Sequence, residues 1–385
     1  MNFALSDDQR MLQDTVERLV LRDYGFEQRK AYAAEPGGWS RQMWRTLAEM
    51  GLLALPFPEA QGGLGGGAVD VLLVMQAFGK ALPLEPLLST MVIGGAILRG
   101  ANPAQLDRWV GAIAAGDMTL AWAHGESGSR YRLHDVACRA QHDTEGWVLD
   151  GSKALVLHGD SADRLLVSAR SAGAQRDPAG ISLFMVDAQA PGIVREASAT
   201  HDGRRAADIR FDKVRVDESD LIGMAGAALP LIQSATEAAI AALAAEAVGV
   251  MDTALAMTVE YLKTRQQFGG PIARFQALQH RAAEMLIALE QSRSMAMYAA
   301  LMLDEPDALE RSKALSAVKV QIGQAARFVG QQAIQLHGGI GVTDEYAVGH
   351  CHKRLAMMDL QFGDVDHHLA QFARAGGFIS TEAIA

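Results

Sequence analysis

The sequence predicts an α+β protein in three successive parts: a helical domain, a β domain and a long helical bundle. Three observations predict it. Apolar residues recur at helical spacing over residues 1–117, and short alternating or apolar runs separated by turn residues fill residues 118–225. Long helical patterns then occupy residues 226–385. A chain of 385 residues is long enough for two or three domains with sizeable cores.

Charge and cysteine content limit which partners and which cellular compartment we expect. A net charge of -10 argues against nucleic acid or an anionic membrane, because neither attracts an acidic surface. Only Cys138 and Cys351 are present, which suits a reducing compartment without disulfides. The first residues show no basic and apolar signal pattern, so we expect a cytoplasmic protein. The most apolar run, residues 238–251, is interrupted by Glu246, which favours a buried helix without membrane insertion.

Capping signals define the helices of the first part. Ser6 with Gln9 resembles a capping box, and Ser40 and Gly51 mark the start and stop of a second helix. Further helices are predicted over residues 69–82, 84–99 and 103–115, the last with Asn102 as its cap. The glycine-rich residues 61–67 lack the combined strand-before and helix-after context of a dinucleotide fingerprint, so a loop is expected rather than a phosphate cradle.

The second and third parts differ in hydrophobic period. Strands are predicted over residues 147–151, 154–157, 164–169, 181–186 and 209–216, ending near residues 222–223. Helices are predicted over residues 229–265, 275–303 and 308–336, followed by a shorter pair divided near Gly363. A helix over residues 229–265 would be about 55 Å long. That length exceeds a small domain and suggests a bundle that packs against other subunits.

A corner between two of these helices has the features of an anion site. Arg265 ends one helical pattern, and Gly269-Gly270-Pro271 leads into the next pattern, which starts near Ile272. Glycine permits unusual backbone angles, and the N–H groups at a helix start attract anions. Arg265 adds a planar charged fork suited to a pyrophosphate. The alternative is an ordinary helix-helix turn with a solvated arginine.

Two motifs in this domain order identify a resemblance. Arg265-Gln-Gln-Phe268-Gly269 with Phe275-Gln276, and later Gln335-Leu-His-Gly338-Gly339, resemble the acyl-CoA dehydrogenases over nearly the whole chain. The resemblance implies an N-terminal helical domain at residues 1–117, a middle β-barrel-like domain at 118–225 and a C-terminal four-helix bundle at 226–385. It also implies that the bundle binds the adenosine and pyrophosphate half of an FAD whose flavin lies mainly in a neighbouring subunit. The cofactor-binding residues implied are Arg265, Gln267, Phe268, Phe275, Gln276, Gln335, Gly338, Gly339 and, near the flavin, Asp364.

The family reaction needs a base, and the usual base positions are empty. The reaction removes a proton next to a thioester while the following carbon gives hydride to the flavin, which requires a carboxylate in a water-poor pocket. By resemblance, Phe362 occupies the usual base position, and Ala239 the second known one. Glu237 and Asp364 are the tentative catalytic replacements. Asp364 also suits a helix N-cap, the alternative we favour, while Glu246 suits a polar role at a bundle interface.

The β domain also departs from the family pattern. His124-Gly125-Glu126-Ser127-Gly128 stands where a Thr-Glu-Pro-Gly-like loop lies under the flavin, and Leu155-Val156-Leu157 where a Trp-x-Thr unit is usual. The expected threonine hydroxyl is missing, although backbone N–H groups there could still bind. The pattern is similar to subunits of heteromeric bacterial acyl-CoA dehydrogenases, such as the small subunit of pimeloyl-CoA dehydrogenase.

The resemblance implies partners and leaves three functions open. It implies an acyl-CoA substrate, a flavoprotein electron acceptor, and a homotetramer or an α2β2 heterotetramer. The leading hypothesis is an acyl-CoA dehydrogenase subunit. The alternatives are a catalytically silent subunit that completes a partner's FAD site, and a flavin monooxygenase on the same fold. The histidines at residues 350–352 and 367–368 are not spaced to complete a metal site, so no metal is expected.

Overall fold

The computed structural model describes residues 5–377. Contacts divide the chain into two compact units. The bundle unit comprises the described residues up to Lys30, Ala68–Pro83 and the described residues from Ile240 onward. The β unit comprises Ala31–Gly67 and Leu84–Ala239. These units cut across the three sequence segments, whose boundaries stay a prediction.

The predicted caps of the N-terminal helices are confirmed. Ser6 with Gln9 and Asn102 with Gln105 form complete capping boxes, and Gly51 adopts the left-handed conformation (φ 74°) after the third helix. The elements of this region are α1 (Asp7–Asp23), α2 (Phe26–Ala33), α3 (Arg41–Glu49), η1 (Leu52–Ala54), η2 (Glu59–Gln61), α4 (Ala68–Gly79), η3 (Leu88–Ile93), α5 (Gly94–Leu98) and α6 (Pro103–Ala114).

One predicted helix differs in type. The segment predicted as a single α-helix over residues 84–99 is a π-helix, η3, followed by the short α5. The hydroxyl of Thr90 in η3 donates to the carbonyl oxygen of Leu120 (3.3 Å) and accepts from its N–H (2.9 Å). Gly94 begins α5 at a place where a Cβ atom would meet Leu120. Packing against the strand that contains Leu120 therefore overrides the regular helical period.

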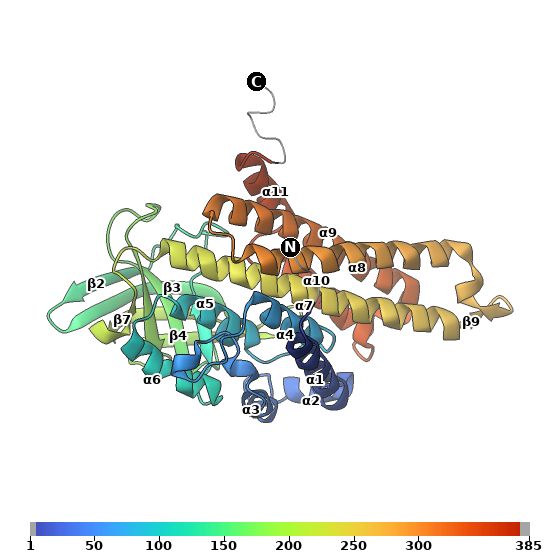
Figure 1. Ribbon diagram of the computed structural model, residues 1–385, viewed down its shortest axis with the longest axis horizontal. Helices are drawn as coiled ribbons and strands as arrows, with labels where there is room; N and C mark the ends of the chain where they lie inside the picture. The colour runs from blue at the N-terminus through green and yellow to red at the C-terminus, as the bar shows by residue number, and fades with distance from the viewer. Residues whose placement is uncertain (1–4, 378–385) are drawn as a thin grey trace, which may run out of the picture. The chain divides into compact units, whose positions relative to one another are not determined.

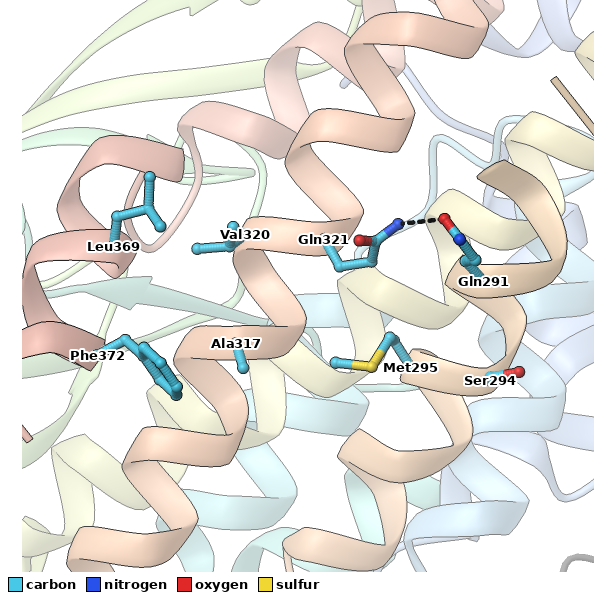
Figure 2. A pocket seen from close by; sticks show the side chains of 8 residues that line it. All are labelled: Gln291, Ser294, Met295, Ala317, Val320, Gln321, Leu369 and Phe372. Atoms are coloured by element: carbon cyan, nitrogen blue, oxygen red, sulfur yellow. Dashed lines mark hydrogen bonds between the residues drawn. The ribbon is translucent and has the colours of Figure 1, made fainter. Parts of the chain in front are cut away.

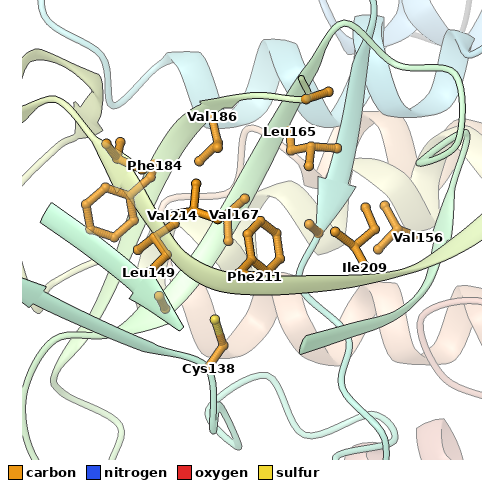
Figure 3. Packing of buried hydrophobic residues seen from close by; sticks show 14 of the residues in the cluster. Cys138, Leu149, Val156, Leu165, Val167, Phe184, Val186, Ile209, Phe211 and Val214 are labelled. Atoms are coloured by element: carbon orange, nitrogen blue, oxygen red, sulfur yellow. The ribbon is translucent and has the colours of Figure 1, made fainter. Parts of the chain in front are cut away.

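The β unit contains one eight-stranded sheet. Its strands are β1 (Leu120–Ala123), β2 (Arg139–Asp143), β3 (Gly146–Leu157), β4 (Arg164–Arg170), β5 (Ile181–Asp187), β6 (Ile193–Ala199), β7 (Arg205–Val216) and β8 (Leu221–Ile222), with η4 (Glu218–Asp220) before the last (Figure 1). The order is β6-β7-β3-β2-β4-β5-β8, and β1 pairs with β4 in parallel. Figure 3 shows Val167, Phe184, Phe211 and Val214 in the apolar core that this sheet encloses.

Strand β3 joins two predicted strands into one. Its ladder with β7 shifts register twice, between Leu149 and Gly151 and between Lys153 and Val156. At the second shift Leu155 is left-handed (φ 49°), which is unusual for a branched side chain. The strand runs on through residues 152–153, which separate the two predicted strands. Strands β1, β2 and β6 were not predicted, since β2 and β6 are largely exposed and lack an apolar run.

The bundle consists of long helices in the predicted order. They are α7 (Leu229–Thr264), α8 (Gln276–Met302), α9 (Ala308–His337), α10 (Ala347–Leu360) and α11 (Val365–Arg374), drawn from yellow to red in Figure 1. Helix α9 packs against α8, α10 and α11. The hairpin β9 (Gln266–Gln267) and β10 (Gly270–Pro271) with η5 (Ile272–Arg274) follows α7, and η6 (Gly338–Val342) follows α9. Helix α7 is long and apolar enough to cross a membrane, but 78% of its most apolar window is buried.

A buried ion pair joins α7 to α10. Two nitrogen atoms of the Arg354 guanidinium donate to the Glu246 carboxylate, Nε to Oε1 and Nη2 to Oε2, each at 2.8 Å. The side chains are 2% and 0% exposed, respectively. The expected polar role of Glu246 inside the bundle is therefore confirmed.

Candidate functional site

The predicted anion corner is a tight hairpin. The N–H of Arg265 donates to Tyr261 O (2.9 Å), and Ile272 N–H donates to Arg265 O (2.9 Å). Between strands β9 and β10, Phe268 (φ 53°) and Gly269 (φ 83°) form a two-residue loop in which both φ angles are positive. This is the signature of a type I′ turn. Glycine suits it, whereas a left-handed phenylalanine is rare and suggests a functional reason.

The hairpin presents aromatic rings to solvent. Phe268 is 79% exposed, and its ring meets that of Phe275 edge to face at 5.9 Å. The Arg274 guanidinium lies 5.2 Å from the Phe275 ring centroid and donates to Phe268 O. Gln276, the first residue of α8, is also exposed. An exposed aromatic pair beside two arginines can hold a flat heteroaromatic ring that carries phosphate.

The second motif lies at the end of α9. Gln335 is exposed in the last turn, and Gly338 has φ 63° and ψ -139°, a conformation that only glycine adopts readily. A Cβ atom at Gly338 or Gly339 would have nothing within 4 Å. The open space above these glycines lets a ligand approach the backbone closely.

Stacked rings hold the two motifs together. Tyr261, one turn before Arg265, stacks on His337 with ring centroids 4.6 Å apart. His337 directly precedes Gly338, and its Nδ1 bonds Ala333 O (2.8 Å). The end of α7 and the end of α9 therefore meet within the bundle unit. Neither Tyr261 nor His337 was predicted, although an aromatic residue four positions before Arg265 was a usable signal.

An apolar groove in the bundle is separate from these residues. Figure 2 shows the groove, about 510 Å³, between α8, α9 and α11, with Gln321 donating to Gln291 across the helices (3.3 Å). Its lining is otherwise mainly apolar, as at Met295 and Phe372. None of the predicted cofactor residues lines this groove. The candidate site is therefore the open surface formed by the hairpin and η6.

The tentative catalytic residues lie in different units. Glu237, in the part of α7 that belongs to the β unit, is 8% exposed. Asp364 accepts the N–H of His367 (2.9 Å) and caps α11, the alternative that the sequence favours. Phe362 lies between α10 and α11 with φ 58°. The catalytic roles of Glu237 and Asp364 stay predictions.

The loop expected under the flavin has its polar groups engaged. Glu126 accepts Lys153 Nζ (2.6 Å) and Cys138 N–H (3.1 Å) at one oxygen, and Ala137 N–H (2.7 Å) at the other. Lys153 Nζ also donates to His124 O (3.2 Å) and Ser168 Oγ (3.1 Å). These bonds stabilise the loop internally.

Backbone N–H groups at and beside residues 155–157, where the threonine hydroxyl is missing, are also engaged. The N–H of Ala154 donates to Gly125 O (2.8 Å) and that of Leu155 to Asp208 Oδ1 (2.7 Å). The N–H of His158 donates to Arg205 O (2.9 Å). These three N–H groups already have internal acceptors, so they are not available as donors to a flavin.

The histidines considered as metal ligands make hydrogen bonds within the protein. Across residues 5–377, no group of three or more His, Cys, Asp or Glu side chains is placed to hold a metal. His350 Nε2 donates to Asp344 O (3.0 Å), and His368 bonds Ser316 and Phe362.

Comparison with known proteins supplies the family. The acyl-CoA dehydrogenase N-terminal, middle and C-terminal domain models match residues 6–117, 119–214 and 229–377. Acyl-CoA dehydrogenase FadE12 of Mycobacterium tuberculosis is 30% identical over 352 residues, 90% of each chain. This chain belongs to the acyl-CoA dehydrogenase family. The predicted fold class is thereby confirmed: N-terminal helical domain, middle β-barrel-like domain and C-terminal four-helix bundle.

Other acyl-CoA dehydrogenases and solved structures agree. The human mitochondrial short-chain specific acyl-CoA dehydrogenase is 26% identical over 307 residues, 78% of this chain and 74% of its own length. The Tcur3481-Tcur3483 steroid ACAD structure has a TM-score of 0.86 at 27% identity, covering 96% of this chain and 97% of that one. The ChsE4-ChsE5 complex of Mycobacterium tuberculosis has a TM-score of 0.88 at 25% identity, covering 99% and 100%. Family members are FAD-dependent oxidoreductases that act on CH–CH bonds of acyl-CoA, the enzyme class that membership indicates here.

Proposed function

We propose that this chain is a subunit of an FAD-dependent acyl-CoA dehydrogenase that desaturates an acyl-CoA thioester between its second and third acyl carbons. One observation supports this proposal most strongly: Tyr261 stacks on His337, and this contact brings the Arg265 hairpin and the Gly338 turn together. Both motifs present exposed groups at the ends of adjacent helices. A flavoprotein electron acceptor and a cytoplasmic location belong to the same proposal.

Different bundle residues would bind different parts of the dinucleotide. Arg265 supplies a positive charge for the pyrophosphate. The net charge of the protein is -10, so the positive charge that a phosphate needs has to come from residues at the site. Gly338 and Gly339 admit the ligand to backbone N–H groups. Phe268 and Phe275 offer rings for the adenine, and the amides of Gln267, Gln276 and Gln335 offer donors and acceptors for nucleotide edges. An FAD held by these residues would supply the hydride acceptor for the third acyl carbon.

Replacing Arg265 by alanine should weaken FAD binding. Loss of a charge-assisted contact corresponds to about 1.5–3 kcal/mol, or roughly 10- to 150-fold in Kd. The measurement is FAD titration of the assembled protein, followed by flavin fluorescence. Arg293→Ala is the matched control, because Arg293 is a partly exposed arginine on α8 that pairs with Asp252 and Glu290. If the Arg265→Ala and Arg293→Ala variants bind FAD equally well, Arg265 does not bind the pyrophosphate.

Glu237 is the proposed base, since it is a buried carboxylate on α7. Glu237→Gln should slow substrate-dependent flavin bleaching by about 10²–10⁴-fold while FAD stays bound, because the amide cannot accept the proton. The measurement is stopped-flow absorbance with an acyl-CoA series. Asp364→Asn is the control, since asparagine caps a helix about as well as aspartate, so a pure cap role predicts unchanged bleaching and little change in stability. Loss of bleaching in Asp364→Asn alone would transfer the role of base to Asp364.

A second candidate function is a catalytically silent subunit. It is favoured by Phe362 at the usual base position and by the engaged N–H groups of Ala154, Leu155 and His158. Two similar solved structures, Tcur3481-Tcur3483 and the ChsE4-ChsE5 complex, each carry the names of two different proteins. We infer an α2β2 assembly for this case and a homotetramer for the first. Visible absorbance and native mass of the purified chain discriminate them: a yellow tetramer that turns over supports the enzyme, and a colourless chain supports the silent subunit.

A further inference from the structure

The turn between α10 and α11 is held in an unusual shape. We call residues Gln361-Phe362-Gly363 the 362 turn. Phe362 is left-handed (φ 58°), and Gly363 has φ 113°. A Cβ atom at Gly363 would lie 2.5 Å from His368 Nε2. A left-handed phenylalanine costs conformational energy and persists only where its surroundings over-determine the backbone.

Lys319 of α9 fixes the entry to this turn. Its Nζ donates to Met358 O (2.7 Å) and Asp359 O (2.9 Å), two carbonyl groups in the last turn of α10. Such carbonyl groups have no partner within the helix and require a donor. Lys319 is 3% exposed, and burial lowers its pKa to about 8. A buried ammonium group is costly unless its bonds are made, so this contact is specific.

His368 of α11 fixes the turn itself. Its Nε2 donates to Phe362 O (3.0 Å), and its Nδ1 therefore accepts from the hydroxyl of Ser316 (3.2 Å). Ser316 lies one turn before Lys319 on α9. One helix therefore holds both the entry to the turn and its central carbonyl group.

Arg354 of α10 fixes the remaining residue. Its Nη1 donates to Gln361 Oε1 (3.4 Å) while Nε and Nη2 hold Glu246 of α7. Three side chains from α9, α10 and α11 thus converge on a short stretch of backbone, and two of them bind main-chain oxygens. The bonds of Lys319 and His368 go to the backbone and that of Arg354 goes to the Gln361 side chain, so none of these bonds uses the Phe362 side chain.

We propose that Lys319, Arg354 and His368 are positioning residues that fix the backbone of the 362 turn independently of which side chain occupies position 362. The proposal deepens the proposed function, because position 362 corresponds to the usual base position of the family. By the resemblance, the family carries its base at this position, where the present chain has phenylalanine. A carboxylate introduced at position 362 would then occupy a turn that is already built.

Hydrogen–deuterium exchange of the purified full-length chain tests the proposal. Lys319→Met should speed exchange over residues 358–366 by about tenfold or more, because both hydrogen bonds to the α10 carbonyl groups are lost. Lys319→Arg, which keeps donors for both carbonyl groups, should restore most of the protection. Val329→Ala removes fully buried side-chain volume from the same helix and should lower Tm without this local effect. Unchanged exchange in Lys319→Met, or an equal rise in Val329→Ala, would overturn the positioning role.

Phe362→Glu tests whether the shape is independent of the residue. The variant should fold and keep exchange over residues 358–366 within about twofold of the parent chain. Faster exchange comparable to Lys319→Met would show that phenylalanine itself holds the turn and would overturn the proposal. These measurements need neither flavin nor substrate. A chain that binds no FAD would therefore defeat the proposed function, whereas this inference is decided by exchange alone.

Discussion

Replacing Glu246 by alanine is expected to lower the free energy of unfolding by about 3–5 kcal/mol, because the buried Arg354 guanidinium loses its counter-charge. Both side chains are almost fully buried, so solvent cannot compensate. The measurement is the midpoint of denaturant unfolding together with Tm. Glu290→Ala is the control: Glu290 contacts Arg293 with 57% of its side chain exposed, and its loss should cost only about 0–1 kcal/mol.

A paired substitution separates buried charge from lost packing. Glu246→Leu with Arg354→Met removes both charges and keeps apolar volume, so it should recover much of the stability lost in Glu246→Ala. The double variant also lacks the Arg354 group that donates to Gln361. Hydrogen exchange at the 362 turn in this variant therefore reports the loss of that bond while global stability is largely kept. If Glu246→Ala costs no more than Glu290→Ala, the ion pair does not stabilise the bundle.

Replacing Lys153 by methionine is expected to lower the stability of the β unit by about 3 kcal/mol or more, because Glu126 keeps a buried negative charge. The Lys153 side chain is 0% exposed and donates to three acceptors around the loop at residues 124–126. The measurement is Tm with hydrogen exchange of that loop. Lys213→Met on β7 is the matched control, since Lys213 is exposed and should change little. Equal effects would mean that Lys153 does not hold the loop.

Elements fixed by short-range chemistry were predictable from the sequence. The capping boxes at Ser6 and Asn102 and the stop at Gly51 depend on residues within one helical turn. The break after Arg265 was predictable for the same reason. The left-handed Phe268 was not, because local preference places Gly, Asn or Asp at that position of a type I′ turn.

Features fixed by residues far apart in sequence were not predictable in this way. The partner of Glu246 lies on another helix, and nothing in the periodicity of α7 selects Arg354. The same holds for Tyr261 and His337, whose stacking unites the two cofactor motifs. The π-helix at residues 88–93 depends on Thr90 bonding a strand that the sequence pattern did not reveal. The site residues were found through family resemblance, because exposed residues carry no periodic signal.

The hairpin, the Gly338 turn and the Tyr261–His337 stack all belong to the bundle unit, whereas the loop and strand expected against the flavin belong to the β unit. After gene duplication, the two half-sites can therefore change independently. A copy whose β unit no longer accepts a flavin would still be required by its sister chain for the nucleotide end. In an assembly of equal numbers of both chains, flavin content per polypeptide would then fall to one half, and the flavin-accepting chain would depend on its sister chain for activity.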